Sequence, residues 1–230
     1  MPNIVNNTTL PSLLDLIFPH SCRGCGRIGN VFCKDCKNYI ITHRQNFCPY
    51  CKKPSPAGKC LSFSCQNFPP TYVISNRNGL LGELIHNYKY YSIRALAHPL
   101  AELLDVSLPP KLPANSVLVP LPTATHHIRT RGLDHTLLIA KHLSKIRHLP
   151  LEKVLIRNKN TVQVGSDRSK RLVQASLAYS INPQYKIKPT TTYILIDDVW
   201  TTGASILSAA HKLQSAGAKD IIIALLAYSS

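Results

Sequence analysis

The chain has 230 residues, of which 44% are hydrophobic and 17% are charged, a composition that fits a globular protein and excludes wholesale disorder. No apolar run is long enough to span a bilayer, and residues 1–9 lack the pattern of a signal peptide, so we expect a cytoplasmic protein without a transmembrane segment. Lys and Arg number 27 against 11 Asp and Glu, a formal charge of +16 that favours an anionic partner such as nucleic acid or a phosphorylated ligand.

All eight cysteines lie within residues 22–65, behind a short amphipathic helix that we expect at residues 10–18. They form four pairs: Cys22/Cys25, Cys33/Cys36, Cys48/Cys51 and Cys60/Cys65. A Cys-x-x-Cys turn brings two thiolates to one metal ion, and two such turns complete a tetrahedral zinc site. The sequence therefore predicts a zinc-binding module in residues 1–70, with two structural zinc ions.

The order of the pairs leaves two zinc arrangements open. In the serial arrangement, which we favour, one ion is held by Cys22, Cys25, Cys33 and Cys36 and the other by Cys48, Cys51, Cys60 and Cys65. In the cross-braced arrangement, the first pair joins the third and the second joins the fourth. A redox role for one Cys-x-x-Cys is the competing function. Locally, Gly26 suits a turn with positive φ, and Cys33–Cys36 is expected to open a helix that runs toward Ile41.

Residues 71–230 alternate apolar runs with segments of helical period. Helices are predicted at residues 80–91, 95–106, 133–146 and 204–216, and strands at residues 116–121, 175–181, 193–196 and 221–227. Pro99 indicates a break inside the second helix, because proline disrupts a helix interior. Strands that alternate with helices indicate an α/β domain with a parallel sheet, and ligands of such sheets lie beyond the carboxyl ends of the strands.

One loop of this domain carries a candidate binding site. Asp197 and Asp198 directly follow an apolar strand, and Thr201, Thr202, Gly203, Ala204 and Ser205 lead into the next helix. Glycine lets the backbone bend closely around a ligand, while hydroxyls and free amides at a helix start suit a phosphate. The carboxylates can accept hydrogen bonds from a sugar diol. Together these groups describe a site for a ribose 5-phosphate, and the competing interpretation is a helix-capping turn with solvated aspartates.

The string Ile196–Ser205 resembles the signature with which type I phosphoribosyltransferases bind 5-phosphoribosyl-1-pyrophosphate (PRPP). The resemblance implies that Asp197 and Asp198 hold the ribose hydroxyls, that residues 201–205 bind the 5′-phosphate, and that Mg²⁺ binds with the pyrophosphate. It also places a pyrophosphate loop at residues 119–129, with Arg129 and Arg131 as candidate ligands of the pyrophosphate.

The layout of nearly the whole chain resembles the ComF family of competence proteins. The matching features are residues 17–22 (Ile-Phe-Pro-His-Ser-Cys), the cysteine pairs, the helix at Leu84–Tyr90, Val119–Pro122, Arg131–His135, Gln163, Arg168 and Arg171. The family usually has Asn and Gln where this chain has Asp134 and His135. The resemblance implies a role in natural transformation, where incoming single-stranded DNA reaches the cytoplasm, with other competence proteins as partners. One relative serves gluconate use instead.

A basic stretch, residues 126–171, holds eleven Lys or Arg and three acidic residues. Within it, the predicted contacts to a nucleic acid backbone are Arg168, Lys170 and Arg171. The candidate platforms for stacked bases are Tyr88, Tyr90 and Tyr91, although two of the three could equally be core residues. We favour a protein that handles single-stranded DNA and uses PRPP as a ligand or signal. Phosphoribosyl transfer to an unidentified base or amine, and a zinc-stapled interaction module, are the alternatives, so the sequence leaves enzymatic activity open.

Overall fold

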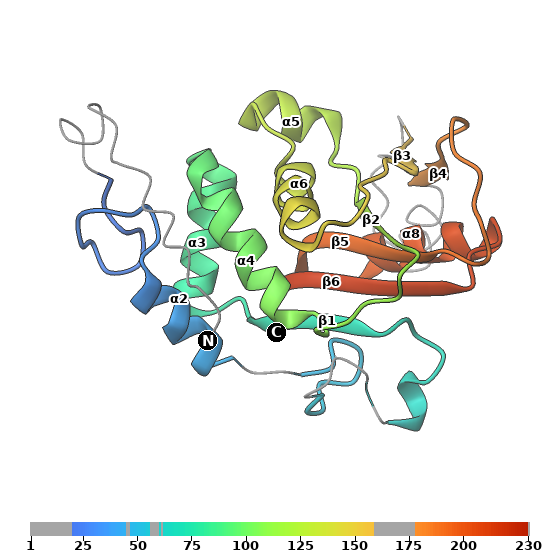
Figure 1. Ribbon diagram of the computed structural model, residues 1–230, viewed down its shortest axis with the longest axis horizontal. Helices are drawn as coiled ribbons and strands as arrows, with labels where there is room; N and C mark the ends of the chain where they lie inside the picture. Colours follow the sequence, from blue (N-terminus) through green and yellow to red (C-terminus); the bar gives the residue numbers. More distant parts are fainter. Residues whose placement is uncertain (1–19, 45–46, 56–59, 61, 159–177, 230) are drawn as a thin grey trace, which may run out of the picture.

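The computed structural model describes residues 20–44, 47–55, 60, 62–158 and 178–229. The helix expected at residues 10–18 and the basic residues Arg168, Lys170 and Arg171 lie outside this part of the chain, as does Gln163. In the described part, a four-stranded sheet lies between two layers of helices, as Figure 1 shows. This arrangement confirms the predicted α/β class.

The central sheet has the strand order β1-β6-β5-β2, and every neighbouring pair is parallel. Its strands are β1 (Thr71–Asn76), β2 (Ser116–Pro120), β5 (Thr192–Trp200) and β6 (Asp220–Tyr228). Most residues of the three strands β2, β5 and β6 are buried, as expected for a parallel sheet that is covered on both faces. The carboxyl ends of the strands therefore meet at one edge, which is where the candidate loop after β5 begins.

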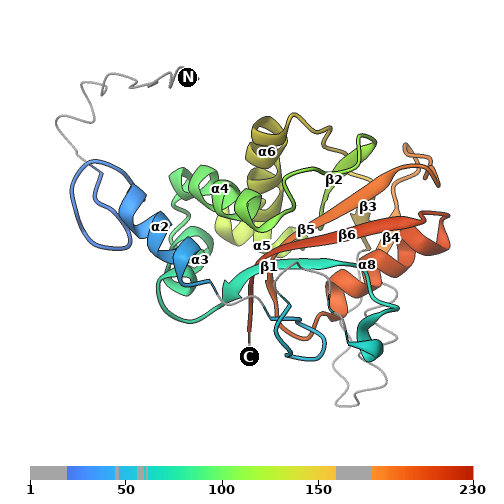
Figure 2. The same ribbon diagram turned by 60° about the horizontal axis from the view of Figure 1, so that its bottom comes forward.

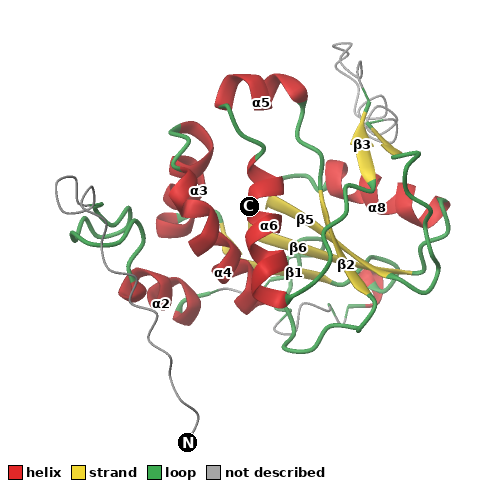
Figure 3. Cartoon of the chain, turned by 45° about the horizontal axis from the view of Figure 1, so that its top comes forward, coloured by secondary structure: helices red, strands yellow, loops and turns green. Residues whose placement is uncertain are grey.

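Each face of the sheet has its own hydrophobic layer. The helices α3 (Gly79–Tyr90), α4 (Ala97–Ser107) and α6 (His135–Arg147) pack over one face, and α8 (Ala204–Ser215) packs over the other (Figure 2). A short antiparallel pair, β3 (Leu155–Arg157) and β4 (Tyr179–Ile181), lies beside α8. The short helix α5 (Thr125–Arg131) stands between the end of β2 and the start of α6, as Figure 3 shows.

Several predicted elements have different limits in the structure. Pro99 breaks nothing, because α4 begins at Ala97 after the 3-10 turn Arg94–Leu96, and proline is tolerated in the first turn of a helix. The strand predicted at residues 193–196 continues to Trp200, paired with β6 along its length. The strand predicted at residues 175–181 is, in its described part, an antiparallel partner of β3 and not a member of the central sheet.

The two cysteine groups lie against different layers. The helix α2 (Lys34–Thr42) follows Cys33, and its buried residues Cys36 and Ile40 join the hydrophobic layer of α3, α4 and α6. The second group surrounds the 3-10 turn Phe63–Cys65 and lies on the side of α8. The first strand of the central sheet, β1, starts at Thr71. None of the helices in the described part of the chain combines the length and the apolar character that a membrane crossing needs.

Candidate functional site

The cysteines gather in the serial arrangement. The sulfur atoms of Cys22, Cys25, Cys33 and Cys36 all lie within 4.8 Å of one another, and so do those of Cys48, Cys51, Cys60 and Cys65. A tetrahedral zinc site with Zn–S bonds of about 2.3 Å needs sulfurs about 3.8 Å apart. The Sγ–Sγ distances are 3.8 Å for Cys22–Cys36 and 3.5 Å for Cys51–Cys60, so each group has the spacing to hold one zinc ion.

Backbone amides also point at these sulfurs. The amides of Gly24 and Cys33 donate to the Sγ of Cys22, at 3.4 and 3.3 Å. The amide of Ser62 donates to the Sγ of Cys60 at 3.4 Å. Such donors favour a thiolate over a thiol, which is the form that binds a metal. Gly26 has φ +75°, as the sequence predicted for the turn after the first pair.

Asp198 projects from β5 toward the layer of α3, α4 and α6. Side chains alternate between the faces of a strand, and Ile194 and Ile196 belong to that layer, so Asp198 faces the same way. Its Oδ2 lies 2.7 Å from the Nζ of Lys89 on α3, and both side chains are largely buried. The carboxylate is therefore neutralised and fixed by a cation that the sequence analysis did not assign to the site.

Asp197 projects toward the opposite face, where β3, β4 and α8 lie. Its Oδ1 accepts the backbone N–H of Asp198 at 2.9 Å. Burial and the neighbouring charge of Asp198 raise the pKa of Asp197 to about 7, against smaller opposing effects of the Asp198 amide, Lys89 and Arg157. A ligand that donates hydroxyl hydrogen bonds or carries positive charge would therefore stabilise the ionised form of Asp197.

The loop after β5 turns sharply at Gly203, whose φ is +74°. A Cβ built on this glycine would lie 2.1 Å from the ring of Trp200, so the turn rests directly on the indole. Around the turn, the side chains of Thr201, Thr202 and Ser205 are exposed. The loop therefore presents its hydroxyls to solvent at the N-terminal end of α8, where the Oγ1 of Thr202 accepts the amide of Ala204 at 3.4 Å. The start of a helix is a place where backbone amides can bind an anion.

The segment after β2 runs beside the aspartates, because the amide of Leu121 donates to the carbonyl of Ile196 at 2.9 Å. The predicted pyrophosphate loop is shorter than expected, since a helix, α5, begins at Thr125 and carries both Arg129 and Arg131. Partial burial, followed by the charges of Arg131, His126, Arg157 and Lys89, lowers the pKa of His127 on this helix. Of these groups, Lys89 and Arg157 also lower the pKa of Asp197, and Lys89 pairs with Asp198.

Asp134 and His135, which depart from the family pattern, have structural contacts here. Asp134 caps α6, because its Oδ1 accepts the amide of Leu137 at 3.1 Å and the hydroxyl of Thr123 at 3.0 Å. His135 is 1% exposed, and its Nε2 lies 3.0 Å from the carbonyl of Tyr88, whose hydroxyl donates to the carbonyl of His135 at 2.8 Å. Tyr88 is fully buried in this pair, so its candidate role as a base platform was wrong.

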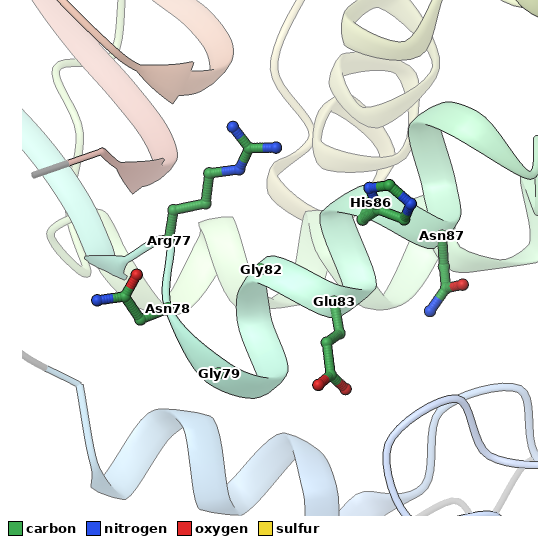
Figure 4. A pocket seen from close by; sticks show the side chains of 7 residues that line it. All are labelled: Arg77, Asn78, Gly79, Gly82, Glu83, His86 and Asn87. Carbon is green, nitrogen blue, oxygen red and sulfur yellow. The ribbon is translucent and has the colours of Figure 1, made fainter.

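The other two tyrosines lie on an exposed face at the end of α3. Tyr90 is 55% exposed and Tyr91 is 68% exposed, and the His86 ring lies within 4.8 and 5.6 Å of theirs. The guanidinium of Arg131 lies 5.1 Å from the centre of the Tyr90 ring. Beside His86, a hollow of about 540 Å³ is lined by Arg77, Asn78, Gly79, Gly82, Glu83, His86 and Asn87. In Figure 4 the Glu83 and Asn87 side chains point away from Arg77, so the hollow has diverging polar groups and does not enclose a small ligand.

Two residues of the site gave little signal in the sequence. Lys89 stands in a helix far from the loop in the sequence, between Tyr88 and Tyr90. Arg157 lies on β3, which was not predicted, and its Nη1 donates to the hydroxyl of Tyr179 at 3.0 Å. Burial raises the pKa of Tyr179, the charge of Arg157 lowers it, and the charge of Asp197 raises it by a smaller amount. Only the tertiary structure brings these groups near the aspartates, Lys89 from α3 and Arg157 from β3.

Comparison with known proteins gives one relative of note. No family model matches the chain. The chain is similar to competence protein ComFC of Bacillus subtilis, with 25% identity over 198 residues, a match that covers 80% of this chain and 78% of the relative. The resemblance to ComFC-like competence proteins, inferred from the motifs, is therefore confirmed as a distant similarity.

Proposed function

We propose that the chain binds PRPP at the carboxyl ends of β5 and β2. The observation that carries this proposal is the turn at Gly203, which exposes three hydroxyl side chains at the start of α8 within a few residues of two aspartates. The hydroxyls and the amides at the start of α8 suit the 5′-phosphate, and the carboxylates suit the ribose diol. The cations Lys89, Arg131 and Arg157 suit the remaining negative charge of the pyrophosphate, which Mg²⁺ would share.

The two aspartates have distinct parts in this proposal. Asp197 forms no ion pair among the described residues and has an elevated pKa, so its ionised form gains most from hydroxyl donors of the ribose. Asp198 is already paired with Lys89, and ligand binding would share that carboxylate between the lysine and a hydroxyl. Residues 201–205 would hold the phosphate, with Arg129 and Arg131 approaching from α5.

Calorimetry with PRPP and Mg²⁺ tests this site. Asp197→Asn and Asp198→Asn should each weaken binding by roughly tenfold or more, because each loses a charge-assisted hydrogen bond. The control is Asp220→Asn, since Asp220 is an exposed carboxylate at the opposite end of the neighbouring strand β6 and should leave affinity unchanged. Equal affinity in wild type and the two site variants would remove the aspartates from the proposed site.

We further propose that each cysteine group binds one structural zinc ion and that the protein acts in the cytoplasm. All four positions of each group are cysteine, which leaves no open coordination position for catalysis. Free thiols grouped as metal ligands fit a reducing compartment, where disulfides do not persist.

The similarity to ComFC supports a role in competence, and we propose that this role is the handling of incoming single-stranded DNA. The net charge of +16 supports an electrostatic contact with the DNA backbone, to which we assign Arg168, Lys170 and Arg171 from the sequence. The exposed Tyr90 and Tyr91, with Arg131 beside them, supply the aromatic and cationic surface on which unpaired bases stack. Other competence proteins are the expected protein partners.

A phosphoribosyltransferase acting on an unidentified acceptor remains the second hypothesis, and its observation is the same PRPP site. Release of pyrophosphate from PRPP in the presence of candidate bases and amines would establish the enzyme. Retention on immobilised single-stranded DNA without such release would favour DNA handling with PRPP as a ligand.

A further inference from the structure

The only tryptophan of the chain, Trp200, lies under the proposed phosphate loop. Its side chain is 5% exposed, and three of its ring atoms lie 2.1 to 2.6 Å from the point where a Cβ of Gly203 would stand. The left-handed turn at Gly203 therefore packs directly on the indole ring. A movement of the indole must change the space that this turn occupies.

The indole is also in contact with Tyr50, a residue within the second cysteine group. Tyr50 stands between Cys48 and Cys51, and its ring meets the Trp200 ring edge-on, with centroids 5.0 Å apart and planes at 80°. The Tyr50 ring also stacks on Phe68 at 4.2 Å, and its hydroxyl lies 2.9 Å from the Oγ1 of Thr71. These contacts leave the tyrosine ring little freedom to turn away from the indole.

The backbone of Tyr50 is fixed through the cysteines on either side of it. The Sγ of Cys48 lies 3.8 Å from that of Cys65, and the Sγ of Cys51 lies 3.5 Å from that of Cys60. A turn closes around the pair, because the amide of Lys52 donates to the carbonyl of Cys48 at 2.8 Å. With a metal ion bound by these four sulfurs, the position of Tyr50 is set by the ligand geometry. Without the metal ion, no bonds hold the four sulfur atoms at this spacing.

The first cysteine group has no such connection among the contacts of the described residues. Its buried members Cys22 and Cys36 pack with Phe32 and Ile40 against the layer of α3, α4 and α6. Trp200 belongs to the layer on the opposite face, against which Phe47 and Tyr50 pack. The two groups have the same ligands but support different parts of the domain.

We propose that Tyr50 is a positioning residue that couples metal binding in the second cysteine group to the shape of the loop Trp200–Ser205. Without that metal, Tyr50 is no longer held in position, so its ring no longer fixes the indole of Trp200. The turn at Gly203 then loses the rigid surface on which it packs. Loss of the metal in the first group leaves the loop in place. The part that concerns phosphate affinity rests on the proposed PRPP site, whereas the part that concerns the indole does not.

The test compares Tyr50→Leu and Tyr50→Phe with the control Phe32→Leu, which alters a buried aromatic residue beside the first group. Zinc content, the emission of Trp200 with its quenching by acrylamide, and PRPP affinity by calorimetry are measured in each. Tyr50→Leu should retain two zinc ions, shift the emission to longer wavelength, and weaken PRPP binding by about two- to tenfold, the range expected for one aromatic contact. Tyr50→Phe should keep most of the ring contact, and Phe32→Leu should leave the emission and the affinity unchanged.

Tyr50→Leu with two zinc ions and unchanged emission and quenching overturns the proposal. If this variant does not fold, chelation decides the matter in Cys25→Ser, whose remaining zinc lies in the second group. Removal of that zinc should shift the Trp200 emission, and an unchanged emission overturns the coupling. If wild type does not bind PRPP at all, the proposed function fails, while the emission still tests the coupling by itself.

Discussion

The two cysteine groups use the same four ligands at similar spacing, yet they stabilise different structures. The first group holds α2 against α3 and α4, where the Nζ of Lys37 also meets the Oε2 of Glu102 at 3.0 Å. The second group holds Tyr50 against Trp200 at the edge where the candidate ligand loop begins. The same set of four cysteines therefore supports different parts of the domain in the two groups. What a structural metal does depends on the side chains that its loops place on the rest of the protein.

The largest expected effect is loss of one metal site. Cys22→Ser and Cys48→Ser each replace a buried ligand, and each should lower the zinc content from two ions per chain to one. Metal binding is folding free energy, so each variant should lose roughly 3 kcal/mol or more of stability. Atomic emission counts the zinc and thermal unfolding reports the stability. One ion or none in the wild type would contradict the two-site assignment, and equal PRPP affinity in the two variants would contradict the difference between the groups.

The next effect concerns two glycines with the same backbone conformation. Gly26 in the first group has φ +75° and Gly203 in the loop has φ +74°, but a Cβ meets nothing within 4 Å at Gly26 and meets the Trp200 ring at Gly203. Gly26→Ala should cost about 1 kcal/mol for the left-handed conformation alone. Gly203→Ala should cost about 2 kcal/mol or more, because the indole must move as well. Urea unfolding measures both, and PRPP binding should be lost only in Gly203→Ala.

A smaller effect is expected from the pH dependence of Asp197. Its pKa is raised from 3.8 to about 7, so between these values the folded protein keeps a proton that the unfolded chain has released. Stability should therefore fall as the pH rises from 4 to 7, and Asp197→Asn should remove this dependence. The variant should be more stable than wild type by about 1 kcal/mol or more at pH 8, and equally stable below pH 4. The control is Asp35→Asn, which removes an exposed ion pair with Arg27 and should leave the fall in stability between pH 4 and 7 as in wild type.

The smallest effect concerns single-stranded DNA and compares two tyrosines of equal exposure. Tyr90 and Tyr39 are both 55% exposed, but only Tyr90 belongs to the proposed base-binding face. Tyr90→Ala should weaken binding by about 1 kcal/mol, the lower end of the range for one stacked base, and leave the dependence on salt unchanged. Tyr39→Ala should have no effect. Lys170→Ala with Arg171→Ala should instead flatten the plot of log affinity against log salt by roughly one unit. Fluorescence anisotropy with a labelled oligonucleotide measures all of these, and no binding at low salt would remove the DNA proposal.

The sequence by itself determined the local features of this protein. The spacing of the cysteines was enough to predict two four-cysteine groups, and the buried run before Asp197 was enough to predict a central strand of a parallel sheet. These features follow from short-range geometry. A Cys-x-x-Cys turn brings its two sulfur atoms to one metal ion, and an apolar strand followed by a helical segment buries itself in a sheet that helices cover. The serial pairing of the cysteines was favoured by their order, but only the folded chain excluded the cross-braced alternative.

The tertiary structure decided which distant residues meet. Lys89 reaches Asp198 only because α3 packs over the face of β5 to which Asp198 points. A shift of the strand register by one residue would turn that carboxylate to the other face. Tyr88 looked like its neighbours Tyr90 and Tyr91 in sequence, yet the helical period turned it into the core against His135. Tyr50 gave no signal beyond its place in a cysteine pair, because its contact with Trp200 joins residues 150 positions apart. Contacts of that kind depend on how whole layers pack, which no local pattern specifies.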